Sequence, residues 1–264
     1  MLIVGERINS SRPEIAEAIA SRDRGFIQGE AKAQAEAGAH YIDVNAGAFF
    51  EKEVEYLKWT MEVVQEVCDL PLCLDSPDAK VIREVLPWAR ITPMVNSITL
   101  EPARLEGILP LVADLQTKVI GLCQSEDMMA DSTAAKVDLA GRLVEKVKLA
   151  GIPVDDLYLD PLVYPLGTDT RSAMATLDAI ALIMREFPRV HTICGLTNVS
   201  HGLPKRKLIN RTFLIAAIIR GLDGAIMDPT DKELYGSLRA AVAVAGQDEY
   251  CLEYIEAFRA GRLG

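Results

Sequence analysis

His40-Tyr-Ile-Asp-Val-Asn-Ala-Gly47 is the stretch that decides the fold of this chain. The run from His40 to Val44 is short and rich in residues that favour β-strands, and it ends at Asn45, two residues before a glycine. The segment that follows places apolar residues at helical spacing on one face, namely Val54, Leu57, Met61, Val64 and Cys68. The stretch therefore predicts a strand, a polar loop and an amphipathic helix in succession.

The same unit recurs about every 30 residues along the whole chain. We expect strands at 2–8, 40–44, 71–74, 94–95, 118–122, 157–159, 191–196 and 224–227. We expect helices at about 13–20, 26–37, 54–68, 78–86, 102–115, 133–150, 171–187, 208–220, 231–245 and 249–259. Strict alternation predicts parallel strands joined by right-handed crossovers, and eight units predict closure into an α/β (β/α)8 TIM barrel. A doubly wound open sheet is the alternative. It would normally carry a glycine-rich turn after the first strand, where this chain has Glu6-Arg7-Ile8-Asn9.

Length and composition limit the classes of protein that fit. The 264 residues suit a single barrel domain spanning 1–264, and half of them are apolar, which is enough for a sizeable core. The net charge of −10 argues against nucleic acid as a partner. No apolar run reaches membrane-spanning length and the N-terminus lacks a signal-peptide pattern, so we expect a cytoplasmic protein without a membrane partner. Five cysteines without CxxC or Cys/His ligand spacing predict reduced thiols and no metal site.

Seven of the eight expected strands end on or just before an Asp or Asn. These residues are Asn9, Asn45, Asp75, Asn96, Asp160, Asn198 and Asp228. In a (β/α)8 barrel the site lies at the carboxyl ends of the strands, so these side chains are candidates for ligand binding. Helix capping is the competing interpretation for each position, because Asp and Asn are favoured in such turns. Asp75, Asp160 and Asn198 are poorly placed to cap a helix, which favours a ligand for these three.

Carboxylates and carboxamides without clustered arginines suit a ligand that has several N–H donors and little negative charge. A pterin ring fits, because a carboxylate can accept both protons of its 2-amino and N3-H edge, while Asn can meet the other edge. Lys205-Arg206-Lys207 is the one basic cluster, and it is either a solvated helix start or a contact for an anionic ligand tail.

The motifs also carry a family resemblance. They are Gly5-Glu6-Arg7-Ile8-Asn9, Asp43-Val44-Asn45, Leu74-Asp75-Ser76, Val95-Asn96-Ser97, Leu159-Asp160-Pro161, Gly195-Leu196-Thr197-Asn198-Val199-Ser200 and Asn210-Arg211-Thr212-Phe213. In this order and spacing they resemble the pterin-binding methyltransferases, most closely those that use methyltetrahydrofolate and a corrinoid/iron–sulfur protein. The folate-binding barrel of cobalamin-dependent methionine synthase is a more distant likeness. Each motif is short, and the specificity lies in the set, which covers nearly the whole chain.

The resemblance implies roles for individual residues. Asp75, Asn96 and Asp160 would hold the pterin, Asn198 would be the catalytic residue facing N5, and Gly195 would let the ring approach the backbone. Asn9, Ser200 and Met227 would line the pocket more loosely, while Asp43, Asn45 and His201 would lie at its rim or face a corrinoid. His201 departs from the acetogenic enzymes, which carry an amide there, and it has either no role or a corrinoid-facing or loop-ordering one. We interpret Glu6 and Arg7 as an ion pair inside the barrel.

The activity implied by the resemblance is methyl transfer between N5 of tetrahydrofolate and the cobalt of a corrinoid. Both directions stay open, and His201 with other rim differences favours transfer to folate. The chain lacks the DxHxxG motif of corrinoid carriers, so the corrinoid would come on a partner protein. Family members are commonly homodimers.

Three other functions stay open at this point. Dihydropteroate synthase shares the pterin barrel but needs a Ser-Arg-Lys type run where this chain has Thr197-Asn198-Val199-Ser200. A non-catalytic folate-binding subunit is the second. A barrel enzyme for phosphate-bearing substrates is the third, to which Gly195 and Gly202 are a poor match.

Overall fold

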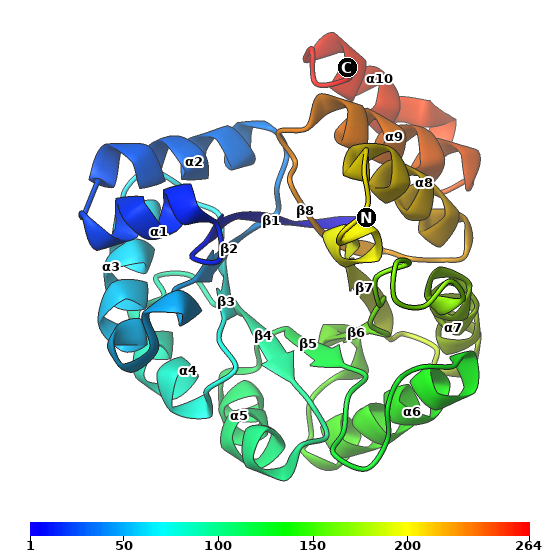
Figure 1. Ribbon diagram of the computed structural model, residues 1–264, viewed down its shortest axis with the longest axis horizontal. Helices are drawn as coiled ribbons and strands as arrows, with labels where there is room; N and C mark the ends of the chain where they lie inside the picture. The colour runs from blue at the N-terminus through cyan, green and yellow to red at the C-terminus, as the bar shows by residue number, and fades with distance from the viewer.

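A computed structural model describes all residues from 1 to 264 and shows a closed barrel of eight parallel strands inside a ring of helices (Figure 1). The strands are β1 (Leu2–Asn9), β2 (Tyr41–Asn45), β3 (Leu72–Asp75), β4 (Met94–Ile98), β5 (Val119–Leu122), β6 (Leu157–Asp160), β7 (His191–Gly195) and β8 (Gly224–Met227). Each strand pairs with the next, and β8 pairs with β1, from Leu2 opposite Gly224 to Gly5 opposite Met227. The (β/α)8 barrel predicted from the sequence is confirmed.

The helices occupy the segments between the strands. They are α1 (Pro13–Ala20), α2 (Arg24–Glu36), α3 (Glu53–Gln65), α4 (Ala79–Val85), α5 (Pro102–Leu115), α6 (Thr133–Leu149), α7 (Ser172–Glu186), α8 (Arg206–Ile219), α9 (Lys232–Val244) and α10 (Leu252–Arg259). Short 3-10 turns lie at Gly47–Lys52, Leu86–Trp88, Val154–Asp156, Leu196–Ser200 and Glu249–Cys251. Helix α10 lies at the outer edge of the ring, beside α9 (Figure 1). No helix is long and apolar enough to cross a membrane.

Local sequence explains where several helices begin. The side chains of Asp23, Asp78, Ser132 and Asp231 accept hydrogen bonds from free backbone amides of α2, α4, α6 and α9. Helices α1 and α5 begin at Pro13 and Pro102, where the missing N–H is not needed. Aspartates that end the strands are therefore not the residues that cap these helices.

The chief difference from the sequence prediction lies after β7. The expected strand 191–196 ends at Gly195, and Leu196–Ser200 form a 3-10 turn that places Asn198 at the mouth of the barrel. Strand β4 is longer than expected and continues to Ile98.

Packing inside the barrel closes its amino-terminal half. A cluster of buried side chains fills that half, formed by Val4, Cys73, Met94, Ile120, Tyr158 and Ile193. Two larger apolar clusters lie elsewhere in the protein. They include strand residues next in sequence to members of the inner cluster, such as Leu74, Leu159 and Cys194, and apolar residues of the helices. Because successive side chains of a strand point to opposite faces, the residue two positions beyond each member of the inner cluster also points inward. The inner cluster is therefore an apolar floor, and the side chains two positions further along each strand lie directly above it.

Candidate active site

A cavity of about 680 Å³ opens at the carboxyl ends of the strands, above that apolar floor. Two positions after the six floor residues come Glu6, Asp75, Asn96, Leu122, Asp160 and Gly195, and all six line the cavity. Because side chains alternate along a strand, the layer directly above the apolar floor is made by these six residues, and most of them are polar. Of the residues predicted for the site, the structure gathers here Asn9, Asp43, Asp75, Asn96, Asp160, Gly195, Asn198 and His201.

Asp43 and Asp75 lie side by side on β2 and β3 and are both withdrawn from water. The Nδ2 of Asn96 donates to Asp43 at 3.4 Å, and the Nδ2 of Asn45 donates to the Oδ2 of Asp75 at 3.1 Å. Burial raises the pKa of Asp43 well above its usual value, and it raises the pKa of Asp75 to about 6. A ligand that donates N–H groups to these carboxyls would favour their charged forms.

Asp160 is fixed in orientation by the backbone around it. Its Oδ1 accepts from the amide of Leu162 at 2.8 Å, and its Oδ2 accepts from the amide of Gly195 at 3.4 Å. Burial raises its pKa to about 6 despite these two bonds. The loop behind it is held by Lys136 of α6, whose fully buried amine donates to the carbonyls of Ala130, Pro161 and Leu162 at 2.7, 2.9 and 2.6 Å.

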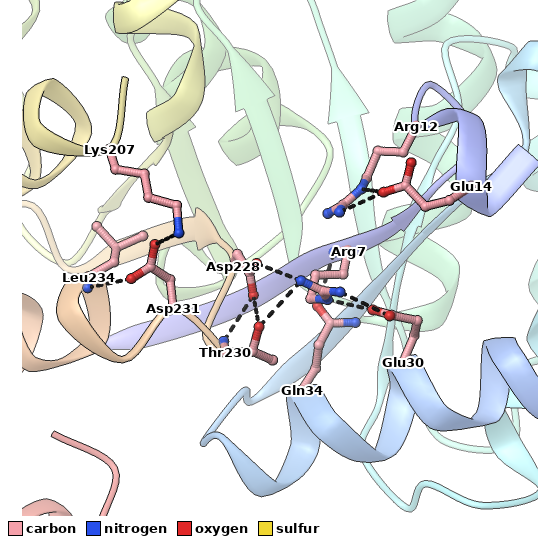
Figure 2. A network of polar contacts seen from close by, with 10 residues as sticks. All are labelled: Arg7, Arg12, Glu14, Glu30, Gln34, Lys207, Asp228, Thr230, Asp231 and Leu234. Carbon is pink, nitrogen blue, oxygen red and sulfur yellow. Dashed lines mark hydrogen bonds and ion pairs between the residues drawn. The ribbon is translucent and has the colours of Figure 1, made fainter. Parts of the chain in front are cut away.

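Glu6 is a cavity residue that the sequence interpretation missed. The predicted ion pair between Glu6 and Arg7 is wrong, because neighbouring residues of a strand point to opposite faces. Arg7 instead donates to Glu30 of α2 at 2.9 Å and to Asp228 at 2.8 Å, as Figure 2 shows. Glu6 faces the cavity, where burial and then the charge of Asp228 raise its pKa to about 7. The signal that could have found it is its spacing of two from Val4, a floor residue.

Asn198 lies on the 3-10 turn Leu196–Ser200 that follows β7, and it lines the cavity. Strand β7 lies across the barrel from β3 (Figure 1). Arg206 of α8 holds this turn, since its Nη2 donates to the carbonyl of Thr197 at 2.8 Å and its Nε to the Oγ of Ser200 at 3.1 Å. The ring of His201 is exposed at the rim, with its Nδ1 3.5 Å from Arg206. The basic cluster of the sequence thus supplies Arg206 and Lys207 to the cavity edge, together with Arg12.

Three residues expected at the pocket lie outside it. Met227 is fully buried in the core cluster that includes residues of α8 and α9, and it is Ile226 of β8 that faces the cavity, again because of strand alternation. Ser200 is fully buried beneath its turn, where it accepts the hydrogen bond from Arg206. Asn45 donates to the cavity residue Asp75 and accepts a hydrogen bond from the hydroxyl of Ser10 at 2.9 Å. These three residues therefore support the strands and turns around the cavity and do not line it.

A closed barrel with such a cavity defines a class of protein. Acidic and carboxamide side chains converge on a pocket whose other walls are the ends of strands, and the only cations lie at its edge. This arrangement suits a flat ligand that donates hydrogen bonds along one edge, held at the carboxyl face of a (β/α)8 barrel enzyme.

The comparison with known families agrees with that class. A family model described as pterin binding enzyme matches residues 5–228. The chain belongs to the pterin-binding enzyme family. The match begins in β1 and ends just after β8, so it spans all the strand ends that form the cavity.

Two curated proteins are similar to this chain in sequence. The chain is 38% identical to the methylcorrinoid:tetrahydrofolate methyltransferase of Eubacterium limosum, over all of this chain and 98% of that protein. It is 28% identical to the methionine synthase of Mycobacterium leprae over 86% of this chain, which spans only 20% of that longer protein.

Solved structures show the same barrel at low sequence identity. A dihydropteroate synthase from Coxiella burnetii in complex with pteroic acid has a TM-score of 0.70 at 13% identity, covering 93% of both chains. One from Xanthomonas albilineans in complex with 7,8-dihydropteroate has a TM-score of 0.64 at 20% identity, covering 94% of this chain and 93% of that one. At these identities the likeness is one of fold.

Proposed function

We propose that the protein transfers a methyl group from the cobalt of a corrinoid, carried by a partner protein, to N5 of tetrahydrofolate. The observation that carries this proposal is the full-length relative at 38% identity, whose name gives both substrates and this direction. The acidic cavity at the strand ends supports it independently, because it suits the pterin head of a folate. The named direction agrees with the one favoured from His201 and the rim.

The cavity supplies partners for both edges of the pterin. Asp75 and Asp160 are the carboxyls that would accept the 2-amino and N3-H protons, and Asn96 would meet ring atoms that accept or donate. Gly195 carries no side chain at the wall beside Asp160, so the ring can approach the backbone there. A substrate without these donors would leave buried carboxyls unpaired, which is the basis of selectivity in this kind of site.

Catalysis would rest on position and electrostatics rather than on a covalent enzyme intermediate. The lone pair of N5 forms the new bond to the methyl carbon, while the cobalt–carbon bond breaks and its electron pair stays with the corrinoid as Co(I). The amine nitrogen carries positive charge until its proton leaves. Asn198 at the cavity mouth would offer its carboxamide oxygen to that N–H. Glu6, with a pKa of about 7 in the same cavity, is a suitable acceptor for the released proton.

The proposal is tested by mixing the protein anaerobically with methylcob(III)alamin and tetrahydrofolate and following the Co(I) absorption. We expect Co(I) to form with the unaltered protein and to form at least about 100-fold more slowly with Asn198→Ala, as when a residue that stabilises transition-state charge is removed. Ser125→Ala, on a loop outside this cavity, is the matched control. Failure to form Co(I) or methyltetrahydrofolate with free or protein-bound corrinoid, despite measurable folate binding, would overturn the proposed reaction.

We also propose that the protein is a cytoplasmic homodimer. Helix α8 exposes an apolar stripe on its outer face, formed by Leu208, Ile215 and Ile219, whose exposed fractions are 58%, 41% and 51%. Such a stripe suits a subunit interface. All five cysteines are free, which suits a reducing compartment. Sedimentation equilibrium of the protein and of Ile215→Glu tests the dimer, and a monomer at micromolar concentration would contradict it.

A further inference from the structure

Arg104 of α5 extends from the ring of helices to the strand that carries Asn96. Its Nε donates to the carbonyl of Ser97 at 2.9 Å, and its Nη2 donates to the Oγ of the same residue at 2.9 Å. Ser97 comes directly after Asn96 in β4 and is only 1% exposed. Arg104 does not line the cavity, but this double contact holds the end of β4 from outside it.

The positive charge of Arg104 is not needed for these two hydrogen bonds. Both oxygens of Ser97 are uncharged, so a neutral donor could satisfy them. Burial opposes the charge and lowers the pKa of Arg104, while the negative charges of Glu101 and Asp75 favour it. A cation kept partly buried beside neutral acceptors indicates that its charge acts on another group.

Asp75 is the cavity residue on which that charge acts. Burial raises the pKa of Asp75 to about 6, and the hydrogen bond from Asn45 and the charge of Arg104 oppose the rise. Arg104 is the cation among the groups that act on this carboxyl. The other ionisable neighbours are carboxyls, which oppose its charge: Glu6 of β1, Asp43 of β2 and Glu53 of α3.

Lys136 stands in the same relation to Asp160. Burial raises the pKa of Asp160, and its two backbone hydrogen bonds and then the charge of Lys136 oppose the rise. The amine of Lys136 binds three loop carbonyls, just as Arg104 binds the neutral oxygens of Ser97. A cation in direct contact with either carboxylate would occupy oxygens that a ligand needs, whereas a cation behind it favours the charge and leaves the oxygens free.

We propose that Arg104 is a positioning residue for pterin binding, which fixes the end of β4 that carries Asn96 and keeps Asp75 charged without occupying its oxygens. The inference rests on the proposed function, in which Asp75 accepts protons from the edge of the pterin. A carboxylate accepts two N–H groups in a fork, and protonation of one oxygen removes that pairing. Affinity for a folate therefore falls where Asp75 gains a proton, and Arg104 sets the pH at which this occurs.

Calorimetric titration with 5-methyltetrahydrofolate, from about pH 5.5 to pH 9, tests this role in the absence of any corrinoid protein. Arg104→Gln can still donate to Ser97 but has no charge, so the pKa of Asp75 rises and affinity falls from a higher pH downwards. We expect this fall to begin about one pH unit higher than in the unaltered protein, with a loss of affinity that approaches tenfold below about pH 6 and shrinks toward pH 9. Titration of the ligand itself is common to all variants and cancels in the comparison.

Arg104→Lys is the matched variant, because it keeps the charge but cannot form the planar fork onto Ser97. Its affinity should fall at the same pH as that of the unaltered protein. Arg104→Met loses both the charge and the hydrogen bonds, so it should show the shift of Arg104→Gln and a further loss that is equal at every pH. Arg83→Gln removes an exposed arginine that lines the same groove between α4 and α5, and it should change nothing.

The outcomes separate the role of Arg104 from the function itself. A loss of affinity by one factor at every pH in both Arg104→Gln and Arg104→Lys would overturn the electrostatic role, since only the contact with Ser97 would then matter. Binding by Arg104→Gln that equals that of the unaltered protein at every pH would overturn the whole inference. Absence of folate binding to the unaltered protein would instead contradict the proposed function.

Discussion

The carboxyl groups of Glu6, Asp75 and Asp160 lie where burial opposes their ionisation, with pKa values of about 7, 6 and 6. Ionising them without a ligand costs free energy of folding, which a donor-rich ligand would return as binding energy. The buried carboxyls of the cavity therefore lower the stability of the folded protein, although they are suited to binding a ligand.

Glu6→Gln is expected to stabilise the protein at pH 8. The folded-state pKa is raised from 4.5 to about 7, so the folded state binds more protons between these values and stability falls as the pH rises through this window. Above pH 7 the cost is constant. Removing it should raise the free energy of unfolding by about 1–2 kcal/mol after allowance for solvent screening. At pH 4.5 the gain should nearly vanish.

Urea unfolding at the two pH values measures this effect. Glu14→Gln is the control, because the pKa of Glu14 is lowered by its own backbone amide and by Arg12, so its loss brings no gain at pH 8. The same stabilisation of Glu6→Gln at pH 4.5 and at pH 8 would contradict the assignment of the cost to ionisation.

The sequence indicated Asp75 and Asp160 correctly as cavity residues, because they end strands and no helix needs them as caps. It did not indicate Glu6, which lies three residues before its strand ends and has an arginine next to it. An adjacent opposite charge suggests an ion pair, but strand alternation separates the two side chains. The basic cluster Lys205-Arg206-Lys207 was interpreted from the sequence as either a solvated helix start or a ligand contact, and the structure places Arg206 and Lys207 at the cavity.

Among the helices, α6 carries a lysine into the core. Lys136 shares one face with Ala140, Leu143 and Val147, at the spacing of a buried stripe. Hydropathy alone places a lysine on the surface, and the three carbonyls that hold its amine come from loops that the sequence does not bring together. The lysine ties α6 to the loop that follows Asp160.

Lys136→Met should lower the free energy of unfolding by about 2–4 kcal/mol, because it leaves three carbonyls without their charged donor. Amide exchange should also become faster at Leu162, whose N–H binds Asp160. Mass spectrometry of hydrogen exchange measures both local and global change. Lys148→Met, on the exposed side of the same helix, is the control. Unchanged exchange at 160–166 in Lys136→Met would show that the loop holds Asp160 without the lysine.

The whole barrel is closed along the seam between β1 and β8. The four residue pairs of that seam are reinforced by Arg7, which joins Glu30 of α2 to Asp228 after β8 (Figure 2). Closure was predictable from the count of eight strand–helix units. The reinforcement by Arg7 was not predictable, because Arg7 and Asp228 lie 221 residues apart in the chain.

Arg7→Met should lower the free energy of unfolding by about 1–3 kcal/mol, because both carboxylates lose their partner in a half-buried setting. Arg24→Met breaks the exposed pairs with Glu62 and Glu66, which solvent screens, and should lower the free energy of unfolding less than Arg7→Met does. Thermal unfolding of the two variants at pH 7.5 compares them. Equal losses would mean that the seam does not depend on Arg7.

Closure by the first and last strands has a consequence for synthesis on the ribosome. Strand β1 emerges first but lacks its second neighbour until β8 has been made, so contacts of the longest sequence separation complete the fold. The cavity draws Glu6 from that first strand and Asn198 and Asn210 from the last third of the chain. A nascent chain has no complete cavity to offer a folate, so the ligand acts on the finished barrel, as a stabiliser after folding rather than as a template during it.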